Sequence, residues 1–446
     1  MNEQTQMIEQ PPAQPVTPRS GFSGADIPAY ADYAHCVHCG LCLNHCPTYK
    51  LWGLEADSPR GRIRQIVLVD QGRLPLGDSF VKHIDQCLDC RACETACPSG
   101  VEYGRLVEAA RAQIEQNYRR PFFSRVARDL VFRGLLPYPR RFAAAARLLY
   151  FYQHSGLQSL ARSSGILRLF GLAQREQLLP PIDREFFFSK LGRMYPAIGA
   201  RRARVALFAG CVAQVSFSAL HEATVRVLTA NGCEVVVPAG QTCCGALAAH
   251  AGVRDVARSL AATNLNVFLR DDFDAVITNA AGCGSTLKEY QHLFAAGAAE
   301  HAKAHEFRQK MRDATEFLAE LGLSARLSPL PMRVTYQDSC HLLHGQKVRE
   351  APRKLLRSIP QLELVEMAMA DYCCGSAGSY NVTETETSLA LLSEKMKHAS
   401  ATKAQTIVTA NPGCLLQMRA GAKIHSTGQN VVHVIELLDR AIAQTS

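Results

Sequence analysis

The stretch TCCGALAAHAG (residues 242–252) returns as YCCGSAGSYN (residues 372–381), and this repeat decides the fold of the second half of the chain. Two further segments repeat with it: VALFAGCVAQ matches VTYQDSCHLLHGQ, and DAVITNAAGCGSTL matches AQTIVTANPGCLLQ. The offsets between matching cysteines are nearly constant at 129 (Cys211 to Cys340), 130 (Cys244 to Cys374) and 131 residues (Cys283 to Cys414). Three matches at nearly one offset indicate an internal duplication. Short β-branched runs alternate with helical stretches throughout, which predicts two similar α/β lobes.

Each copy contains two adjacent cysteines followed by a glycine, at Gly245 and Gly375. Neighbouring Cα atoms are too close for an ordinary disulfide, so each pair is better interpreted as two ligands of one metal centre. We expect the glycine to let the backbone approach that centre. The remaining repeated cysteines complete a set of four in each lobe, which would hold an additional cluster or zinc: Cys211, Cys243, Cys244 and Cys283, then Cys340, Cys373, Cys374 and Cys414.

Eight further cysteines form two runs near the N-terminus, CVHCGLCLNHCP (36–47) and CLDCRACETACP (87–98). Both follow C-x2-C-x2-C-x3-C-P, the dicluster ferredoxin pattern, in which the fourth cysteine of each run binds the other cluster. Zinc sites usually show paired C-x2-C units with a longer gap, so zinc is the weaker interpretation. The pattern assigns Cys36, Cys39, Cys42 and Cys97 to one 4Fe-4S cluster, and Cys87, Cys90, Cys93 and Cys46 to a second.

The composition of the chain indicates the cellular compartment in which this chemistry takes place. The chain has 446 residues, of which 47% are hydrophobic, and its 17 cysteines are an odd number in tight clusters. Clustered thiols of this kind point to metal or redox chemistry in a reducing compartment, hence to the cytoplasm. Residues 1–20 lack the apolar core of a signal peptide, and no stretch predicts a transmembrane helix. One cysteine, Cys233, belongs to no set and is expected to be a small buried residue.

The sequence therefore predicts a multidomain protein: an α-helical ferredoxin-type domain with two clusters, a helical segment, and two duplicated α/β lobes of the CCG type, named after their cysteine pair and glycine. The expected division is a disordered tail (1–28), the dicluster 4Fe-4S domain (29–120), a helical linker region (121–203), lobe 1 (204–328) and lobe 2 (329–446).

Residues 121–170 carry eight arginines against the single acid Asp129. In PRRFAAAARLLYFY they alternate with apolar residues at helical spacing, so this surface could lie on a membrane or an acidic partner. The alternative, which we favour from sequence, is a helix pair packed on its own core with the arginines outside.

Other side chains give weaker signals. Arg60, Arg62 and Arg64 could place positive charge near the clusters, or form a solvated helix face. His301 and His305 are interpreted as a solvated helix face, and His341 and His344, which follow Cys340, as turn caps rather than groups that tune a centre. No G-x-G-x-x-G follows a strand with an acid about 20 residues on, so no flavin or nicotinamide is expected in this chain.

Taken together, the two runs, SPRGRI, CETACPSGVEYGRLVE, NAAGCGSTLKEY, QDSCHLLHGQ and DYCCGSAGSYN resemble the iron-sulfur subunit family of bacterial glycolate oxidase. The resemblance extends from about Ala31 to the C-terminus. The second half also resembles the CCG domains of heterodisulfide reductase. Those domains use five cysteines, and the fifth is missing from both lobes here, at GCGS and GCLL, so the unusual cluster of that family cannot simply be carried over.

The resemblance implies an electron-transfer subunit that works with FAD-containing glycolate oxidase subunits and delivers electrons to the quinone pool, on the inner face of the membrane as a peripheral protein. No catalytic residue and no nucleic-acid partner are expected in this chain. Three alternatives stay open: a subunit of a D-lactate or other 2-hydroxy-acid dehydrogenase, a heterodisulfide or quinone reductase acting at the cysteine pairs, and a scaffold whose cysteine pairs hold zinc.

Overall fold

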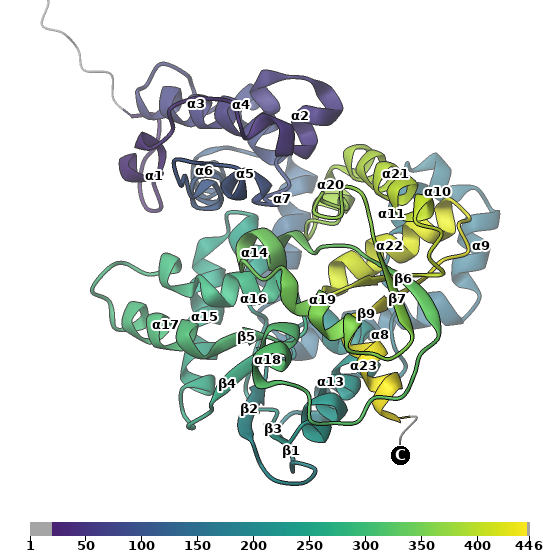
Figure 1. Cartoon of the computed structure of the whole chain (residues 1–446). Coiled ribbons are helices and arrows are strands. Elements are labelled where there is room, and N and C mark those ends of the chain that lie inside the picture. The colour runs from purple at the N-terminus through teal and green to yellow at the C-terminus, as the bar shows by residue number, and fades with distance from the viewer. Residues whose placement is uncertain (1–19, 444–446) are drawn as a thin grey trace, which may run out of the picture.

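The computed structural model describes residues 20–443 and divides them into a helical N-terminal part that rests on two α/β lobes (Figure 1). Most of the predicted tail, residues 1–19, lies outside the described residues. The rest of that tail is packed: Phe22 is buried, and the backbone N–H of Gly21 donates to the carbonyl of Val69. An aromatic side chain that finds an apolar pocket gains enough from burial to order the residues around it.

The N-terminal part is a cluster of short helices around one small apolar core. Helix α3 begins where Ser58 caps it, by accepting a hydrogen bond from Gly61 N at 3.0 Å, and Pro59 follows at the first helical position. Both residue types favour a helix start. The elements are α1 (Tyr30–Ala34), η1 (Leu43–His45), α2 (Pro47–Trp52), η2 (Glu55–Asp57), α3 (Pro59–Asp70), α4 (Asp78–Asp85), α5 (Ala92–Thr95) and α6 (Tyr103–Asn117).

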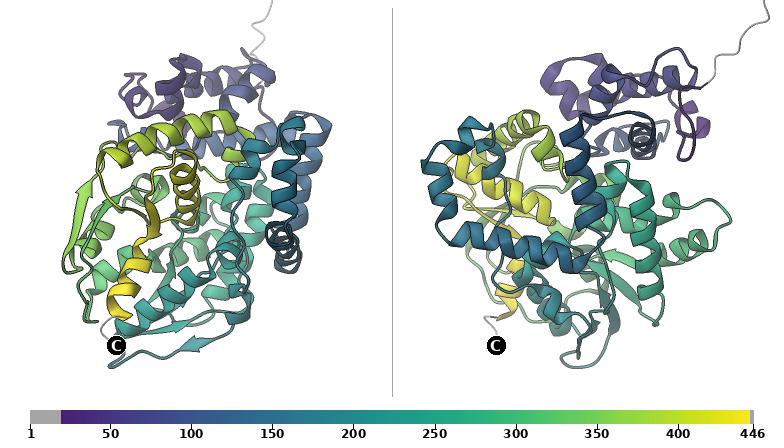
Figure 2. Two further views of the ribbon diagram at one scale, coloured as in Figure 1. Left: turned by 90° about the vertical axis from the view of Figure 1, so that its right-hand side faces the viewer. Right: turned by 180° about the vertical axis from the view of Figure 1, so that it is seen from behind.

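The linker region follows along the outside of the molecule, as the rear view in Figure 2 shows. Within residues 121–179 only Phe132, Leu136, Ala146, Glu176 and Leu178 are buried. The favoured expectation of a helix pair packed on its own core is therefore wrong. Too few linker side chains are buried to form a separate hydrophobic core. The linker elements are α7 (Phe122–Arg128), the π-helix η3 (Asp129–Leu135), α8 (Pro139–His154), α9 (Leu157–Ser163), α10 (Ile166–Leu169), α11 (Ala173–Gln177) and η4 (Phe187–Lys190).

Lobe 1 is built on a five-stranded sheet with the order β1-β3-β2-β4-β5. All pairs are parallel except β1 with β3, so the end of the expected helical linker is in fact an antiparallel edge strand. The elements are β1 (Met194–Tyr195), β2 (Ala203–Leu207), α12 (Val212–Ser216), α13 (Ser218–Ala230), β3 (Cys233–Val236), α14 (Ala246–His250), α15 (Arg254–Phe268), β4 (Ala275–Thr278), α16 (Ala281–Lys288), η5 (Tyr290–Leu293), α17 (Ala299–Lys310), β5 (Met311–Asp313) and α18 (Ala314–Leu321).

Lobe 2 repeats this plan with four parallel strands in the order β7-β6-β8-β9. In both lobes the first strand of the repeat pairs with the second and the third, which is the arrangement expected of duplicated α/β units. The elements are β6 (Met332–Tyr336), the π-helix η6 (His341–Gly345), α19 (Glu350–Arg357), β7 (Leu362–Glu366), α20 (Tyr380–Thr383), α21 (Thr385–Ala401), β8 (Thr406–Thr409), α22 (Pro412–Ile424), β9 (Asn430–His433) and α23 (Val434–Ala443).

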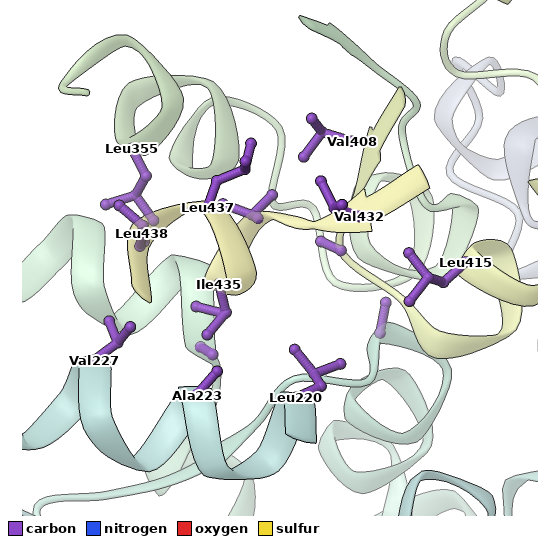
Figure 3. Close-up of a cluster of buried hydrophobic side chains, with 14 of the residues drawn as sticks. Leu220, Ala223, Val227, Leu355, Val408, Leu415, Val432, Ile435, Leu437 and Leu438 are labelled. Atoms are coloured by element: carbon purple, nitrogen blue, oxygen red, sulfur yellow. The ribbon is translucent and has the colours of Figure 1, made fainter. Parts of the chain in front are cut away.

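The two lobes share one apolar core. Leu220, Ala223 and Val227 on α13 of lobe 1 face Ile435 and Leu438 on α23 of lobe 2 (Figure 3). These residues are buried, so the lobes form one rigid body on which the cysteine loops are fixed. Within residues 20–443, no helix has both the length and the apolar character needed to cross a bilayer.

Gly252 marks a close approach of lobe 1 to the N-terminal part. Its φ is +85°, and a Cβ there would lie 2.3 Å from the carbonyl oxygen of Arg111 in α6. Gly297 has a similar φ of +88° but open space around it, which makes it a matched control. We predict that Gly297→Ala costs about 1 kcal/mol of stability, the price of the left-handed backbone alone. Gly252→Ala should cost clearly more, because backbone must move.

Thermal unfolding of the two variants measures this difference. Equal shifts in melting temperature for Gly252→Ala and Gly297→Ala would contradict the close contact between α6 and the end of α14.

Candidate functional site

The first cysteine site draws on both ferredoxin-type runs. Cys36, Cys39, Cys42 and Cys97 line a single pocket. Burial raises the pKa of the Cys36 thiol, and the neighbouring thiols of Cys97 and Cys39 raise it further. The structure thus brings these four side chains together, and Cys93 of the second run lines the same pocket. Cys39 is exposed, so this site reaches the surface.

The second site is buried. Cys46 comes from the first run, and Cys87, Cys90 and Cys93 come from the second; all four are buried. Burial raises the pKa of the Cys93 thiol well above its usual range, and the thiols of Cys90, Cys87 and Cys46 act in the same direction. Cys46 of the first run therefore lies beside the cysteines of the second run, and the exchange of the fourth cysteine stays a prediction.

The spacers between the cysteines make this convergence possible. His38, Gly40, Asp89 and Arg91 lie between the first three cysteines of their runs, and all have positive φ, between 52° and 84°. A left-handed residue in each spacer curls the chain so that successive thiols point to one centre. For a residue other than glycine this conformation costs about 1–2 kcal/mol, which indicates strain kept at a functional site.

Arg62 is the arginine that lies by the second site. It is fully buried, it donates to Thr48 Oγ1 at 3.1 Å, and the thiols of Cys87 and Cys46 help to raise its pKa against the effect of burial. Arg60 lies at the surface by the first site, bonded to Glu55 and to the carbonyl of His38. Arg64 is exposed. Both interpretations of the arginines thus hold, each for a different residue.

In lobe 1, each cysteine of the set follows a strand. Cys211 comes after β2, Cys243 and Cys244 come after β3, and Cys283 follows β4 at the start of α16. The Sγ atoms of Cys243 and Cys211 lie 3.3 Å apart. Hydrogen bonding with Cys211 and Cys244 holds the pKa of Cys243 well below its usual range. The ends of parallel strands are where open α/β sheets place their binding sites.

Lobe 2 repeats this geometry after β6, β7 and β8. The hydrogen bond with Cys340 and burial raise the pKa of the Cys373 thiol well above its usual range, and contact with Cys374 and burial do the same for Cys414. Asn411 donates from Nδ2 to Cys414 Sγ at 3.4 Å and accepts at Oδ1 from Gly282 N of lobe 1 at 3.3 Å. A single side chain thus links Cys414 of lobe 2 to the backbone next to Cys283 of lobe 1.

The two glycines that follow the cysteine pairs share a left-handed backbone conformation. Gly245 and Gly375 have φ of +81° and +88°, and a Cβ on Gly375 would lie 2.5 Å from the carbonyl oxygen of Ser388 in α21. They are required by a left-handed turn and, at Gly375, by close packing against α21. Their N–H groups do point to sulfur, at 3.5 Å from Cys243 Sγ and Cys373 Sγ.

The donor chemistry of the four sites fits iron-sulfur clusters. Sulfur is the donor in each, and backbone N–H groups such as that of Asp89, 3.3 Å from Cys87 Sγ, bond to it as they do around such clusters. Thiols that raise one another's pKa lose their protons when the positive charge of a metal is added. Cys233 belongs to none of these sets and is a small buried residue, at the start of β3 within the apolar core.

Sequence reasoning missed a buried group of charges between the parts. His250, on α14 of lobe 1, lies 2.8 Å from Glu108 of α6 and 3.1 Å from Asp89 of the second run. These carboxylates raise the pKa of His250 to about 9, although burial acts against them. His250 is therefore a cation at neutral pH and holds lobe 1 against the second run.

Arg91 and His341 complete the group, which we call the charged junction: Asp89, Arg91, Glu108, His250, Glu289 and His341. The Arg91 guanidinium pairs with Glu289 of lobe 1 and lies 3.5 Å from Glu108. His341 of lobe 2 lies 2.9 Å from the carbonyl of Asp89 through Nε2, and burial lowers its pKa to about 4. Asp89, Glu108 and His250 could also be grouped as a cation site, but Arg91 and His250 already supply the positive charge.

The four histidines to which the sequence analysis gave no functional role differ in their contacts: two join parts of the molecule, and two lie on the surface helix α17. His344 bridges Thr95 Oγ1 at 2.9 Å and the carbonyl of Asp371, so it joins the second run to lobe 2, as His341 does, rather than capping a turn. His305 is exposed on α17, and His301 is half-buried there. The spacing of the junction residues gave no signal, because they come from separate elements of three parts of the chain.

Comparison with known proteins covers the chain from the first run onwards. The family model of the 4Fe-4S dicluster domain matches residues 32–101, that of the glycolate oxidase iron-sulfur subunit linker region matches residues 123–179, and that of the cysteine-rich CCG domain matches residues 205–288 and 334–419. A solved structure of a hypothetical protein from Helicobacter pylori aligns over 57% of this chain and 52% of its own, with a TM-score of 0.41 and 11% identity.

Two curated relatives span nearly the whole chain, and a third aligns with about half of it. The probable glycolate oxidase iron-sulfur subunit of Bacillus subtilis is 43% identical, and the glycolate oxidase iron-sulfur subunit of Escherichia coli is 31% identical; each alignment covers 91% of this chain and 93% of the relative. Lactate utilization protein A of Oceanobacillus iheyensis is 34% identical over 53% of this chain and 96% of its own length.

The crossed arrangement of the first two sites makes a specific prediction. Cys97→Ser should resemble Cys36→Ser, because both would remove a ligand of the first site, and Cys46→Ser should resemble Cys87→Ser at the second site. Each variant should lose about one cluster's iron, and EPR of the reduced protein should show the same remaining signal within each pair. Cys233→Ala is the control and should keep full iron content.

The opposite pairing, in which Cys97→Ser resembles Cys87→Ser, would show that each run binds its own cluster with its own fourth cysteine.

Proposed function

The chain belongs to the glycolate oxidase iron-sulfur subunit family, and from this premise we propose that it takes electrons from FAD-containing partner subunits and passes them towards the quinone pool. It is an electron-transfer component of an oxidoreductase complex. When bound, its iron-sulfur clusters supply carriers that accept one electron at a time. The two-electron oxidation of the 2-hydroxy acid takes place, in this proposal, on the flavin of the partner.

One observation carries the proposal: the cysteine sites adjoin one another from the surface to the interior of lobe 2. Cys39 opens the first site to solvent, and Cys93 of the second site lines the pocket of the first. Cys90 of the second site then shares an apolar cluster with Cys373 and Cys340 of lobe 2. An electron relay needs a series of neighbouring sites, whereas an enzyme with one active site does not.

Side chains around the second site exclude water from the space between it and lobe 2. Leu88 and Leu391 are buried there with Cys90 and Cys373. Tyr380 donates from its hydroxyl to the carbonyl of Gln86 at 3.0 Å, and Tyr372 donates to that of Cys46 at 3.4 Å. Burial raises the pKa of the Cys90 thiol well above its usual range. Among the neighbouring thiols, that of Cys373 makes the largest further contribution in the same direction. The second site therefore contacts lobe 2 more directly than solvent.

These contacts support the ligand sets that we propose. Two 4Fe-4S clusters are held by the first site (Cys36, Cys39, Cys42, Cys97) and the second (Cys87, Cys90, Cys93, Cys46). The four cysteines of each lobe hold a further cluster without a fifth cysteine, which supports a relay and structural role rather than the disulfide chemistry of heterodisulfide reductase. The complex works at the cytoplasmic face of the membrane.

A second substrate has an observation in its favour. Lactate utilization protein A aligns with this chain over 96% of its own length. A complex that oxidises lactate would pass electrons through the same sites, because this chain does not contact the 2-hydroxy acid. The substrate is therefore a property of the flavin subunits, and it has to be tested on the assembled complex.

The proposal predicts that glycolate reduces the clusters of the complex, purified anaerobically with its flavin subunits. EPR should show reduced iron-sulfur signals after glycolate is added, while the isolated chain should respond to dithionite but not to glycolate. D-lactate and L-lactate serve as parallel substrates.

Two results would overturn the assignment. Clusters that dithionite reduces and no 2-hydroxy acid reduces would exclude the relay. Reduction of a disulfide by the isolated chain would place an active site at the cysteine pairs.

A further inference from the structure

The linker helices expose apolar side chains where a soluble protein would place polar ones. We use the name linker face for the solvent-facing side of α7, η3, α8, α9, α10 and α11. Its most exposed apolar residues include Phe123, Leu169 and Leu148, at 85%, 81% and 73% of their full accessible surface. Exposed apolar residues gathered along consecutive helices in this way mark an interaction site with a protein or a membrane.

Helix α8 has apolar residues on both its inner and its outer side. Its inner side packs Ala146 against Ile182 and Val215. Its outer side presents Leu148 and Phe151, together with exposed arginines. An ordinary surface helix has an apolar inner face and a polar outer face. Here the inner side already has its partner, so the outer apolar residues are left for something outside the chain.

The charge of the linker face points to an anionic occupant. The two acids of these helices are already paired, the exposed Asp129 with Arg133 and the buried Glu176 with Arg162. Six exposed arginines make no ion pair with a carboxylate anywhere in residues 20–443: Arg125, Arg140, Arg141, Arg147, Arg168 and Arg175.

These six arginines are spread over four helices, α7, α8, α10 and α11, among the exposed aromatic and leucine side chains. Arg125 and Arg141 lie over the rings of Phe122 and Tyr138. Long arginine side chains can lie along apolar surface while the guanidinium reaches a charged layer above it. Helices that lie in a membrane interface have two such features. Their apolar residues are buried at the boundary between headgroups and acyl chains, and their cations bind the anionic headgroups.

From these observations we infer that the linker face docks on an anionic lipid surface, with α8 to α10 lying in the headgroup layer. The rear view of Figure 2 shows these helices running along one side of the molecule, so they can meet a surface together. A protein partner would match point charges in a defined groove, whereas cations spread over four helices suit a fluid anionic layer. The inference rests on the proposed function for its purpose, because a quinone is dissolved in the bilayer.

The test is flotation of the purified full-length chain with vesicles. We expect it to float with vesicles of phosphatidylcholine and phosphatidylglycerol, to bind pure phosphatidylcholine poorly, and to lose binding as salt is raised. Leu148→Ser/Phe151→Ser and Arg140→Glu/Arg168→Glu should each weaken binding by roughly tenfold or more. The matched controls lie outside the linker face: Val382→Ser/Ile424→Ser, and Arg270→Glu/Lys403→Glu with the same change of charge. Circular dichroism and iron content confirm that all variants fold.

Several results would overturn the inference. One is failure of the wild-type chain to bind anionic vesicles at low salt. A second is equal loss of binding in the controls, which would mean general charge attraction. A third is that the linker variants bind vesicles normally but dissociate from the flavin subunits or dissolve a dimer, since the face would then bind protein. Reduction of the complex by glycolate is measured separately in detergent, so loss of vesicle binding and loss of the relay can be told apart.

Discussion

The charged junction is the constraint on which the arrangement of the sites depends. Asp89 and Arg91 lie between cysteines of the second run, and their charges are balanced by Glu108, by His250 and Glu289 of lobe 1, and by contact with His341 of lobe 2. A buried charge without its partner costs about 3–5 kcal/mol. The second run is therefore held against both lobes by these contacts, and Cys90 lies beside Cys373.

The two lobes share their plan but differ around the cysteines. Lys395 of lobe 2 is buried, donates to the carbonyl of Ala370, and lies near Cys374 and Cys373. In lobe 1 a neutral side chain, Asn264, bonds to the corresponding loop at the carbonyl of Cys243. Duplication thus produced two similar sites in different surroundings, of which the one in lobe 2 adjoins the ferredoxin-type part.

The sequence allowed the cysteine sets, the duplication and the family to be predicted, because ligand spacing and repeat offset are local signals. It could not reveal the charged junction, whose members come from the second run, α6 and the two lobes. It also misled on the linker: the spacing of PRRFAAAARLLYFY is helical either way, and only packing shows that Leu148 and Phe151 face outwards. The roles of Gly245 and Gly375 likewise depended on neighbours that are distant in sequence.

The central claim is that all four cysteine sites hold iron-sulfur clusters. The most direct measurement is iron, acid-labile sulfide and zinc content, with EPR, on the anaerobically purified chain and on its Cys243→Ser/Cys373→Ser variant. The account predicts iron and sulfide in similar amounts without zinc, and a variant that loses the lobes' share while it keeps the two ferredoxin-type signals. Zinc in the lobes, or a variant with unchanged iron, would contradict it.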